Sequence, residues 1–202
     1  MDNAALYKMG YGLYVLTAQH EGRDNGCIIN TALQVTSSSP PLGVVTVNKQ
    51  NHSHDMILAS KKCNISMLTV ETPFALIQRF GFQSGKTVDK FADYKDVARA
   101  ENSLLYLTQG TNAYLSFKVT EAFDFGTNTM FKAEITDGAV LGGAESLTYA
   151  YYHQHIKPKP QAAPSKGYRC TICGYVYEGE PLPDDFICPI CKHGASDFVK
   201  IT

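Results

Sequence analysis

The sequence predicts a mainly β protein: a closed or partly closed β-barrel with a few short helices, followed by a small metal-binding domain. Three observations support this. Most apolar stretches in the first 156 residues have the length and alternation of strands. A proline-rich stretch, IKPKPQAAPSKG, then interrupts the chain at residues 156–167. Two CxxC pairs follow, and in a chain without a secretion signal they indicate a metal or redox site.

The first strands are predicted from runs of aromatic and β-branched residues. Tyr11–Ala18 is expected to be extended and to end in a turn at Glu21–Gly26. Extended chain then resumes over Cys27–Thr36, and Leu42–Asn48 is expected to be a buried strand. Together these segments predict the first half of the barrel wall.

The second half of the wall is predicted from alternation. Polar and apolar residues alternate along Ala113–Ala122, as they do in a half-buried strand. Met130–Leu141 is expected to form two short extended runs around a turn at Asp137-Gly138. Mostly antiparallel strands with few helices favour a barrel.

Two short helices are expected between these halves. Ser53 is a suitable N-cap for a helix over His54–Ser60. Thr72 and Pro73 are expected to open a second helix that ends at Arg79 or Phe80.

The domain boundaries follow from the composition. Residues 1–156 are the predicted barrel, 157–166 a proline-rich linker, and 167–202 the metal domain. The formal net charge is -1, and no basic stripe is present, which argues against a nucleic-acid partner. No apolar run approaches the roughly 20 residues that span a bilayer, and no signal peptide is visible, so we expect a cytoplasmic protein without a membrane partner.

The cysteine spacing predicts one metal ion. Cys170 and Cys173 form the first pair, fourteen residues follow, and Cys188 and Cys191 form the second. A two-residue gap lets each pair form a tight knuckle, and two facing knuckles give a tetrahedral four-sulfur shell that suits zinc or iron. The ligand geometry alone leaves both metals open.

A resemblance favours iron. The segments YRCTICGYVY (168–177) and CPIC (188–191), together with Phe198, resemble the two knuckles of rubredoxins, which implies one iron ion held by four cysteine thiolates. The stretch between the knuckles is shorter than in a typical rubredoxin. Phe186 stands where tryptophan is usual, and Lys192 where glycine is usual.

The predicted barrel lacks the glycine-rich loops of nucleotide-binding folds. Its segments NGCIINTA (25–32), NKQNHSH (48–54) and FGFQSGK (80–86) resemble, in this order, the flavin reductase-like family of split β-barrels. The resemblance implies an FMN-binding domain that forms a homodimer.

The same segments supply the chemistry that FMN needs. Hydroxyl groups and cations suit its phosphate, and amides suit its ribityl chain and ring edge. The predicted FMN-binding residues are Asn30, Thr31, Ala32, Asn48, Lys49, Ser53, His54, Ser84, Gly85 and Lys86. The charged segment Val88–Lys95 is instead predicted to be a solvated part of the surface.

The whole architecture resembles the high-molecular-weight rubredoxins of anaerobes. This resemblance implies that NADH or NADPH reduces FMN, that the four-cysteine iron accepts the electrons, and that a protein such as a flavodiiron reductase of nitric oxide or oxygen receives them. Two alternatives stay open: a non-catalytic carrier reduced by a separate reductase, and an FMN-binding module with a structural zinc ribbon.

Overall fold

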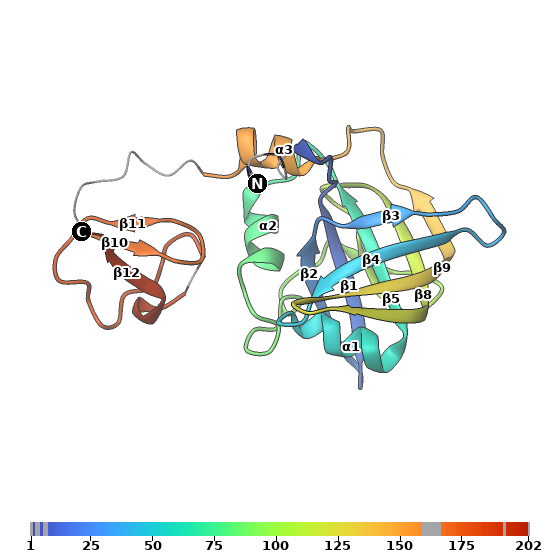
Figure 1. The fold of residues 1–202 in the computed structure, drawn as a ribbon, viewed down its shortest axis with the longest axis horizontal. Helices are drawn as coiled ribbons and strands as arrows, with labels where there is room; N and C mark the ends of the chain where they lie inside the picture. Colours follow the sequence, from blue (N-terminus) through green and yellow to red (C-terminus); the bar gives the residue numbers. More distant parts are fainter. Residues whose placement is uncertain (1, 3–4, 6–7, 159–166, 192, 202) are drawn as a thin grey trace.

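The computed structural model describes residues 2, 5, 8–158, 167–191 and 193–201. It consists of a β-barrel and a small C-terminal β domain (Figure 1). The strands of the barrel wall are β1 Tyr14–His20, β2 Arg23–Ile29, β3 Ala32–Gln34, β4 Leu42–Asn48, β5 Lys62–Leu68, β8 Thr111–Phe125 and β9 Asn128–Val140. A separate short hairpin pairs β6 Val97–Arg99 with β7 Leu105–Leu107. The predicted linker lies mostly outside the described residues.

The strand order explains why the sheet curls. The seven strands pair in the order β2-β1-β5-β8-β9-β4-β3, so β2 and β3 occupy the two edges. Only Asn30 and Thr31 separate these two strands in the chain. Since two residues cannot bridge a flat sheet of seven strands, the edges must approach each other, and the sheet forms a split barrel. The predicted fold class is confirmed.

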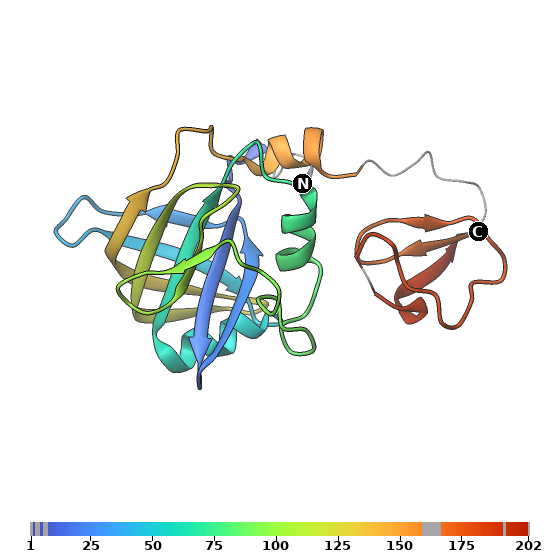
Figure 2. The ribbon, with the colours of Figure 1, turned by 180° about the vertical axis from the view of Figure 1, so that it is seen from behind.

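The interior of the barrel is filled by alternate residues of its strands. In β4, Gly43, Val45 and Val47 are buried while their neighbours are half-buried, which matches the predicted strand residue for residue. A second apolar cluster lies outside the barrel, where α2 (Phe74–Gly81) packs through Leu76, Ile77 and Phe80. Figures 1 and 2 show that α2 stands on the side of the barrel that faces the small domain.

Four local predictions are corrected by the structure. The turn after β1 comprises only Glu21 and Gly22, whose φ angles of 49° and 75° are typical of a two-residue type I′ hairpin, and Arg23–Gly26 belong to β2. The extended run over Cys27–Thr36 is broken at the edge of the barrel, between β2 and β3.

The helix α1 (His52–Ser60) begins two residues earlier than predicted. Asn51 is its N-cap, because the Asn48 carbonyl accepts the Asn51 N–H at 3.0 Å and the Asn48 side chain accepts the Gln50 N–H at 2.8 Å, which turns the chain there. Ser53 is therefore a buried residue of the first helical turn and not the N-cap.

The predicted turn at Asp137-Gly138 is also wrong, because both residues lie within the continuous strand β9. The register with β8 shifts between the pairs Ser116–Asp137 and Phe117–Ile135, so the extra residue is accommodated as a β-bulge. A Cβ on Gly138 would lie 2.6 Å from the Leu115 side chain and 2.8 Å from the Tyr114 carbonyl oxygen. The close approach of β8 and β9 at the bulge therefore requires a glycine at this position.

The C-terminal domain is a three-stranded antiparallel sheet in the order β11-β10-β12. Its strands are β10 Gly167–Cys170, β11 Val176–Tyr177 and β12 Phe198–Ile201. The chain between the two domains carries α3 (Tyr149–Tyr151) and a π-helical turn over Tyr152–Ile156. Within the described parts of the chain, no helix is both long and apolar enough to span a membrane.

Candidate metal centre and the adjoining polar cleft

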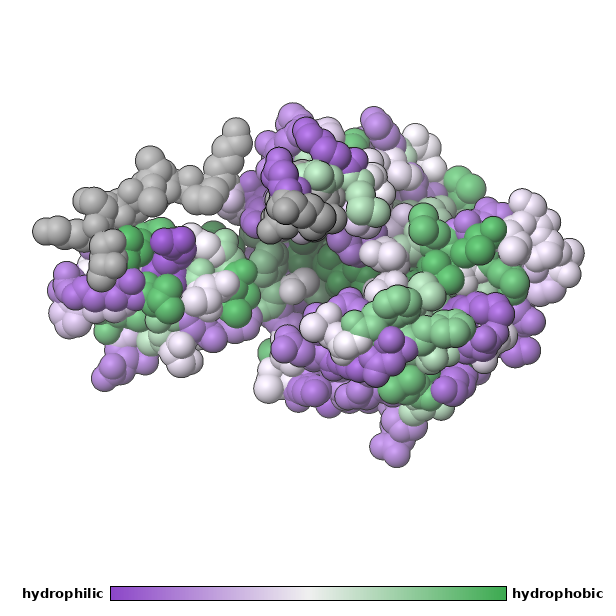
Figure 3. Space-filling model, viewed as in Figure 1, coloured by the Kyte–Doolittle hydropathy of each residue, from purple (hydrophilic) through white to green (hydrophobic). Residues whose placement is uncertain are grey.

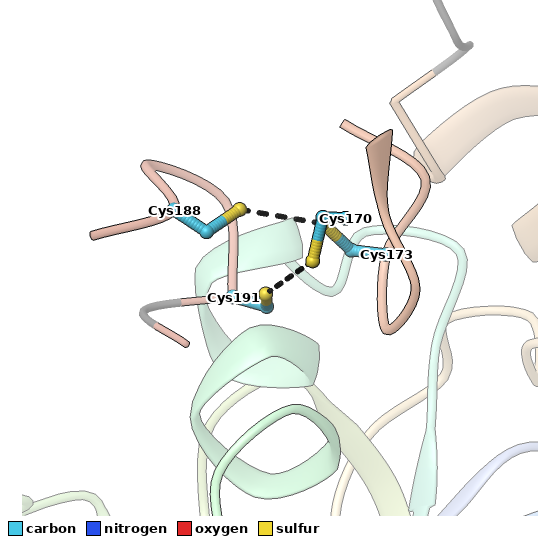
Figure 4. A group of neighbouring side chains, drawn as sticks. All are labelled: Cys170, Cys173, Cys188 and Cys191. Carbon is cyan, nitrogen blue, oxygen red and sulfur yellow. Dashed lines mark hydrogen bonds between the residues drawn. The ribbon is translucent and has the colours of Figure 1, made fainter. Parts of the chain in front are cut away.

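The four cysteines converge in the C-terminal domain (Figure 4). Their sulfur atoms all lie within 4.8 Å of one another, and the Cys170–Cys191 and Cys173–Cys188 pairs are each 3.5 Å apart. Metal–sulfur bonds of about 2.3 Å in a tetrahedron place sulfurs about 3.8 Å apart, so the cluster fits one tetrahedral ion. Three of the four cysteines are buried, and Cys173 is half-buried.

The two knuckles share one backbone pattern. The Cys170 N–H donates to the Tyr175 carbonyl, and the Cys188 N–H donates to the His193 carbonyl, each at 2.8 Å and each five residues ahead. Gly174 takes a φ of +82°, which the tight return of the first knuckle requires. The equivalent residue of the second knuckle, Lys192, lies outside the described residues.

Backbone N–H groups also point at the sulfurs. Burial raises the pKa of the Cys188 thiol, but hydrogen bonds from the Cys191 and Ile190 N–H groups and from neighbouring cysteines outweigh it, and the pKa is lowered. The Tyr175 and His193 N–H groups make the same kind of bond to Cys173 and Cys191, where burial outweighs it and the pKa of each thiol is raised. Such bonds stabilise thiolate charge and tune the potential of a metal bound there.

An aromatic shell covers the cluster. Phe186, at the position predicted to replace tryptophan, lies 4.6 Å from the Tyr177 ring and 5.3 Å from the Phe198 ring, measured between centroids. Tyr168 and Tyr175 also pack against the cysteines. This shell limits the access of water to the sulfurs.

One residue of the barrel belongs to the same shell. Phe82 packs against the cysteine cluster and also against the apolar cluster around α2, where its ring lies 5.9 Å from that of Phe74. It directly follows α2, and its N–H donates to the Gln78 carbonyl. The metal centre therefore contacts the barrel through the residue that ends α2.

A polar cleft of about 230 Å³ lies beside Phe82. Its barrel side is formed by the middle of β2, the start of α1, the loop after α2 and Lys90, and its other side by the two metal knuckles. The lining residues are Asn25, Cys27, Gln50, Asn51, His52, Gly81, Phe82, Gln83, Ser84, Gly85, Lys90, Ile172 and His193.

The cleft is electropositive. The pKa of His52 is lowered, first by burial and then by the nearby cations Arg23, Lys86 and Lys90, while Asp55 opposes them. Arg23 also donates to the Gly85 carbonyl at 2.7 Å, which fixes the loop after α2 against β2. Amides, a hydroxyl and three cations around one cleft form a donor set that fits an anionic ligand with polar edges, such as a phosphate ester.

The structure brings some of the predicted FMN-binding residues to this cleft. Ser84 and Gly85 line it, and Lys86 contributes to its positive charge. Ser53 lies directly behind the lining, where its hydroxyl accepts a hydrogen bond from Asn25 at 2.9 Å. Their assignment to FMN stays a prediction.

The other predicted residues lie elsewhere on the barrel. Lys49 pairs with Asp124 at 2.6 Å, and the buried His54 contacts Asp55 and Thr129 at 2.9 Å. Asn30, Thr31 and Ala32 lie where β2 passes into β3, and Asn48 ends β4. Their assignment to FMN also stays a prediction.

Sequence reasoning missed Lys90. The segment Val88–Lys95 was predicted to be solvated, but Lys90 is only 3% exposed and its ammonium donates to the Gly26 and Phe80 carbonyls at 2.9 and 3.0 Å. Phe91 and Tyr94 pack against Phe80 with ring centroids 5.2 and 5.5 Å away. Two aromatic residues on one side of a turn, Phe91 and Tyr94, were the signal in the sequence that could have predicted the packing of this segment against the barrel.

Comparisons with known proteins agree with this anatomy. The flavin reductase like domain family matches residues 6–159, and the rubrerythrin, rubredoxin-like domain family matches residues 168–199. A high molecular weight rubredoxin of Moorella thermoacetica is 41% identical over an alignment of 233 residues that covers all of both chains. A ferric-chelate reductase (NAD(P)H) of Archaeoglobus fulgidus is 40% identical over 159 residues, which cover 79% of this chain and 93% of that protein.

Solved structures show the same barrel. An NADH:FAD oxidoreductase of Streptomyces globisporus superposes with a TM-score of 0.62 at 21% identity, covering 73% of this chain and 88% of that one. The chain is thus an oxidoreductase with a flavin-type barrel and a rubredoxin-type site. From these matches, the chain belongs to the flavin reductase-like family and, within it, to the high-molecular-weight rubredoxins.

Proposed function

We propose that this chain transfers electrons from NAD(P)H, through FMN bound in the polar cleft, to one iron ion held by Cys170, Cys173, Cys188 and Cys191, and on to a protein acceptor. The observation that carries the proposal is the position of Phe82, which lines the cleft and packs against the cysteine cluster. A bound flavin supplies the change from a two-electron hydride to single-electron transfer.

The residues around the cleft bind and orient the flavin in this proposal. Arg23, Lys86 and Lys90 supply the charge for its phosphate, and the Ser84 hydroxyl and nearby backbone N–H groups supply hydrogen bonds. Phe82 excludes water between the cleft and the metal centre. The remaining predicted residues, Asn30, Thr31, Ala32, Asn48, Lys49 and His54, are proposed to take part where a second copy completes the site.

A homodimer and a flavodiiron-type acceptor complete the proposal. Leu33, Val35, Phe125 and Val140 are each at least 60% exposed, on or directly beside β3, β8 and β9. Green patches on the barrel surface in Figure 3 mark exposed apolar side chains of this kind. A sedimentation mass of one chain would exclude the dimer.

An anaerobic NADH titration followed by absorbance tests the proposed function. We expect both the flavin bands and the ferric–thiolate bands of the metal centre to bleach, at about three electrons per chain, two for flavin and one for iron. Flavin bands beside stoichiometric zinc would instead support the zinc-ribbon alternative. A flavin that NADH does not reduce would support the carrier.

Gly85→Ala is expected to weaken FMN binding about tenfold. The added Cβ would lie 2.1 Å from Asn25 Oδ1, and Asn25 is buried and bonded to Ser53, so its amide must leave that hydrogen bond. Loss of a hydrogen bond that contributes about 1.4 kcal/mol corresponds to a tenfold change in affinity. Fluorescence titration of the apoprotein with FMN measures the change.

Gly143→Ala is the matched control, because a Cβ there meets nothing within 4 Å. We expect it to bind FMN as the wild type does. Equal affinities for wild type and both variants would place the flavin away from Asn25 and Gly85.

A further inference from the structure

The metal domain closes the polar cleft with the surface that surrounds its own metal site. Ile172 lies between the two cysteines of the first knuckle, and His193 lies two residues after the last cysteine of the second. Both residues line the cleft opposite Gly81–Gly85 and His52. The two knuckles, and not the sheet of the metal domain, therefore face the barrel.

The contact between the domains is apolar and small. Phe82 reaches the cysteine cluster from the barrel, while Ile172 is still 44% exposed. Among the described residues, no hydrogen bond or ion pair crosses this contact, whereas the barrel strands are joined by backbone hydrogen-bond ladders. In Figure 3 the small domain adjoins the barrel at a recess lined with green, apolar residues. Such a contact can form and break without unfolding either domain.

The space left in the cleft is also small. The cleft encloses about 230 Å³ between the barrel and the two knuckles. Hydride transfer requires the nicotinamide to lie against the flavin ring, with the reacting atoms about 3–3.5 Å apart. With the metal domain in place, Ile172 and His193 occupy the side of the cleft opposite the barrel residues, from which a nicotinamide would approach a flavin bound there.

We propose that the metal domain and the nicotinamide of the hydride donor occupy the mouth of the polar cleft in turn. This inference rests on the proposed function. The donor gives a hydride from its C4–H bond and leaves as NAD(P)⁺, while the two electrons stay on the protein and the proton passes to solvent on reoxidation. At each docking of Ile172 and His193, one electron would pass from the flavin site to the metal centre and reduce ferric to ferrous iron. The protein acceptor would reoxidise the iron between dockings, so two dockings balance one hydride. The undocked knuckle surface is then free to meet the protein acceptor.

Ile172→Asp in the full chain, loaded with FMN and iron, tests the inference. A carboxylate placed against Phe82 disfavours docking because its burial would require desolvation. Hydrogen–deuterium exchange should become about tenfold faster in the loop at residues 82–86, where the Lys86 N–H donates to Ser84 Oγ. Val199→Asp is the matched control, since Val199 is 52% exposed on β12 and does not line the cleft. We expect wild-type exchange in the control.

The two half-reactions should then change in opposite directions. In rapid mixing, NADH should reduce the flavin of the Ile172→Asp protein several-fold faster, and the iron should follow about tenfold more slowly. General damage would slow both steps. Phe82→Ala alters the barrel side of the contact without changing any knuckle residue. If Ile172→Asp loses iron, Phe82→Ala takes its place, and it should give the same faster reduction of the flavin and slower reduction of the iron.

NAD⁺ cannot donate a hydride, so it tests whether the nicotinamide and the metal domain compete for the mouth of the cleft or only lie near each other. Added to the oxidised wild type at a concentration that dialysis shows to be saturating, NAD⁺ should raise exchange around Ile172 and His193 to the level of the variant. Unchanged exchange with NAD⁺ bound, or a variant in which both half-reactions keep their rates, overturns alternate occupancy. If wild-type flavin is not reduced by NADH at all, the proposed function fails, while the exchange result for Ile172→Asp still decides docking.

Discussion

Cys188→Ser is expected to abolish metal binding and to stop electron delivery, while the flavin remains reducible by NADH. Serine is a poor ligand at neutral pH, and the three remaining thiolates leave the tetrahedral shell open. Because binding of a structural metal contributes about 10–16 kcal/mol to the folding of a small metal domain, the domain should also lose its fold. Metal analysis should give less than about a tenth of an ion per chain, and reduction of the protein acceptor should fall about 100-fold or more.

The barrel should survive this substitution. Its two apolar clusters are built from barrel residues and the helices against them, and the cysteine cluster forms a third core of its own. Cys63→Ala is the control, because Cys63 is a fully buried cysteine of β5 outside the metal site. We expect full iron content in that variant. Loss of iron from Cys63→Ala, or its retention in Cys188→Ser, would contradict the assigned ligands.

Lys90→Met is expected to lower both the stability of the barrel and its affinity for FMN. The substitution leaves the Gly26 and Phe80 carbonyls without their donor, at about 1–3 kcal/mol each. We expect the free energy of unfolding to fall by about 2–4 kcal/mol in denaturant titrations of the flavin-free protein. Removal of one cation from the cleft should also weaken FMN binding about tenfold, or about 1.4 kcal/mol.

Lys95→Met provides the control, since Lys95 lies in the same segment and is exposed. It makes the same change in charge, and we expect less than about 0.5 kcal/mol of change in stability. Equal effects of the two substitutions would show that Lys90 acts only through net charge.

The pH dependence of this difference has a definite sign. Burial lowers the pKa of Lys90, with Cys27 opposing, so between the native pKa and about 10.4 the unfolded chain holds a proton that the native protein releases. Stability conferred by Lys90 therefore rises with pH through that window. The gap between wild type and Lys90→Met should widen as the pH approaches 10, and a gap that narrows would contradict a lowered pKa.

Most strands of the barrel could be predicted because each is specified locally. The alternation in β4 matches its burial, and β8 extends the predicted run at both ends. The failures involve contacts distant in sequence. The bulge that carries β9 through Asp137 and Gly138 exists because β8 lies alongside, and the early start of α1 depends on how β4 ends in a turn at Asn48.

The metal centre could be predicted from the sequence, since two CxxC pairs set the ligands and the knuckle geometry through residues close in the chain. The barrel with flavin-type motifs could be predicted as well. Which motif residues share the cleft depends on the tertiary structure, because Ser84 and Gly85 meet Asn25 from a segment about sixty residues away. The burial of Lys90 and the position of Phe82 between the cleft and the cysteines also depend on the tertiary structure, because packing between distant segments leaves no period or spacing in the sequence.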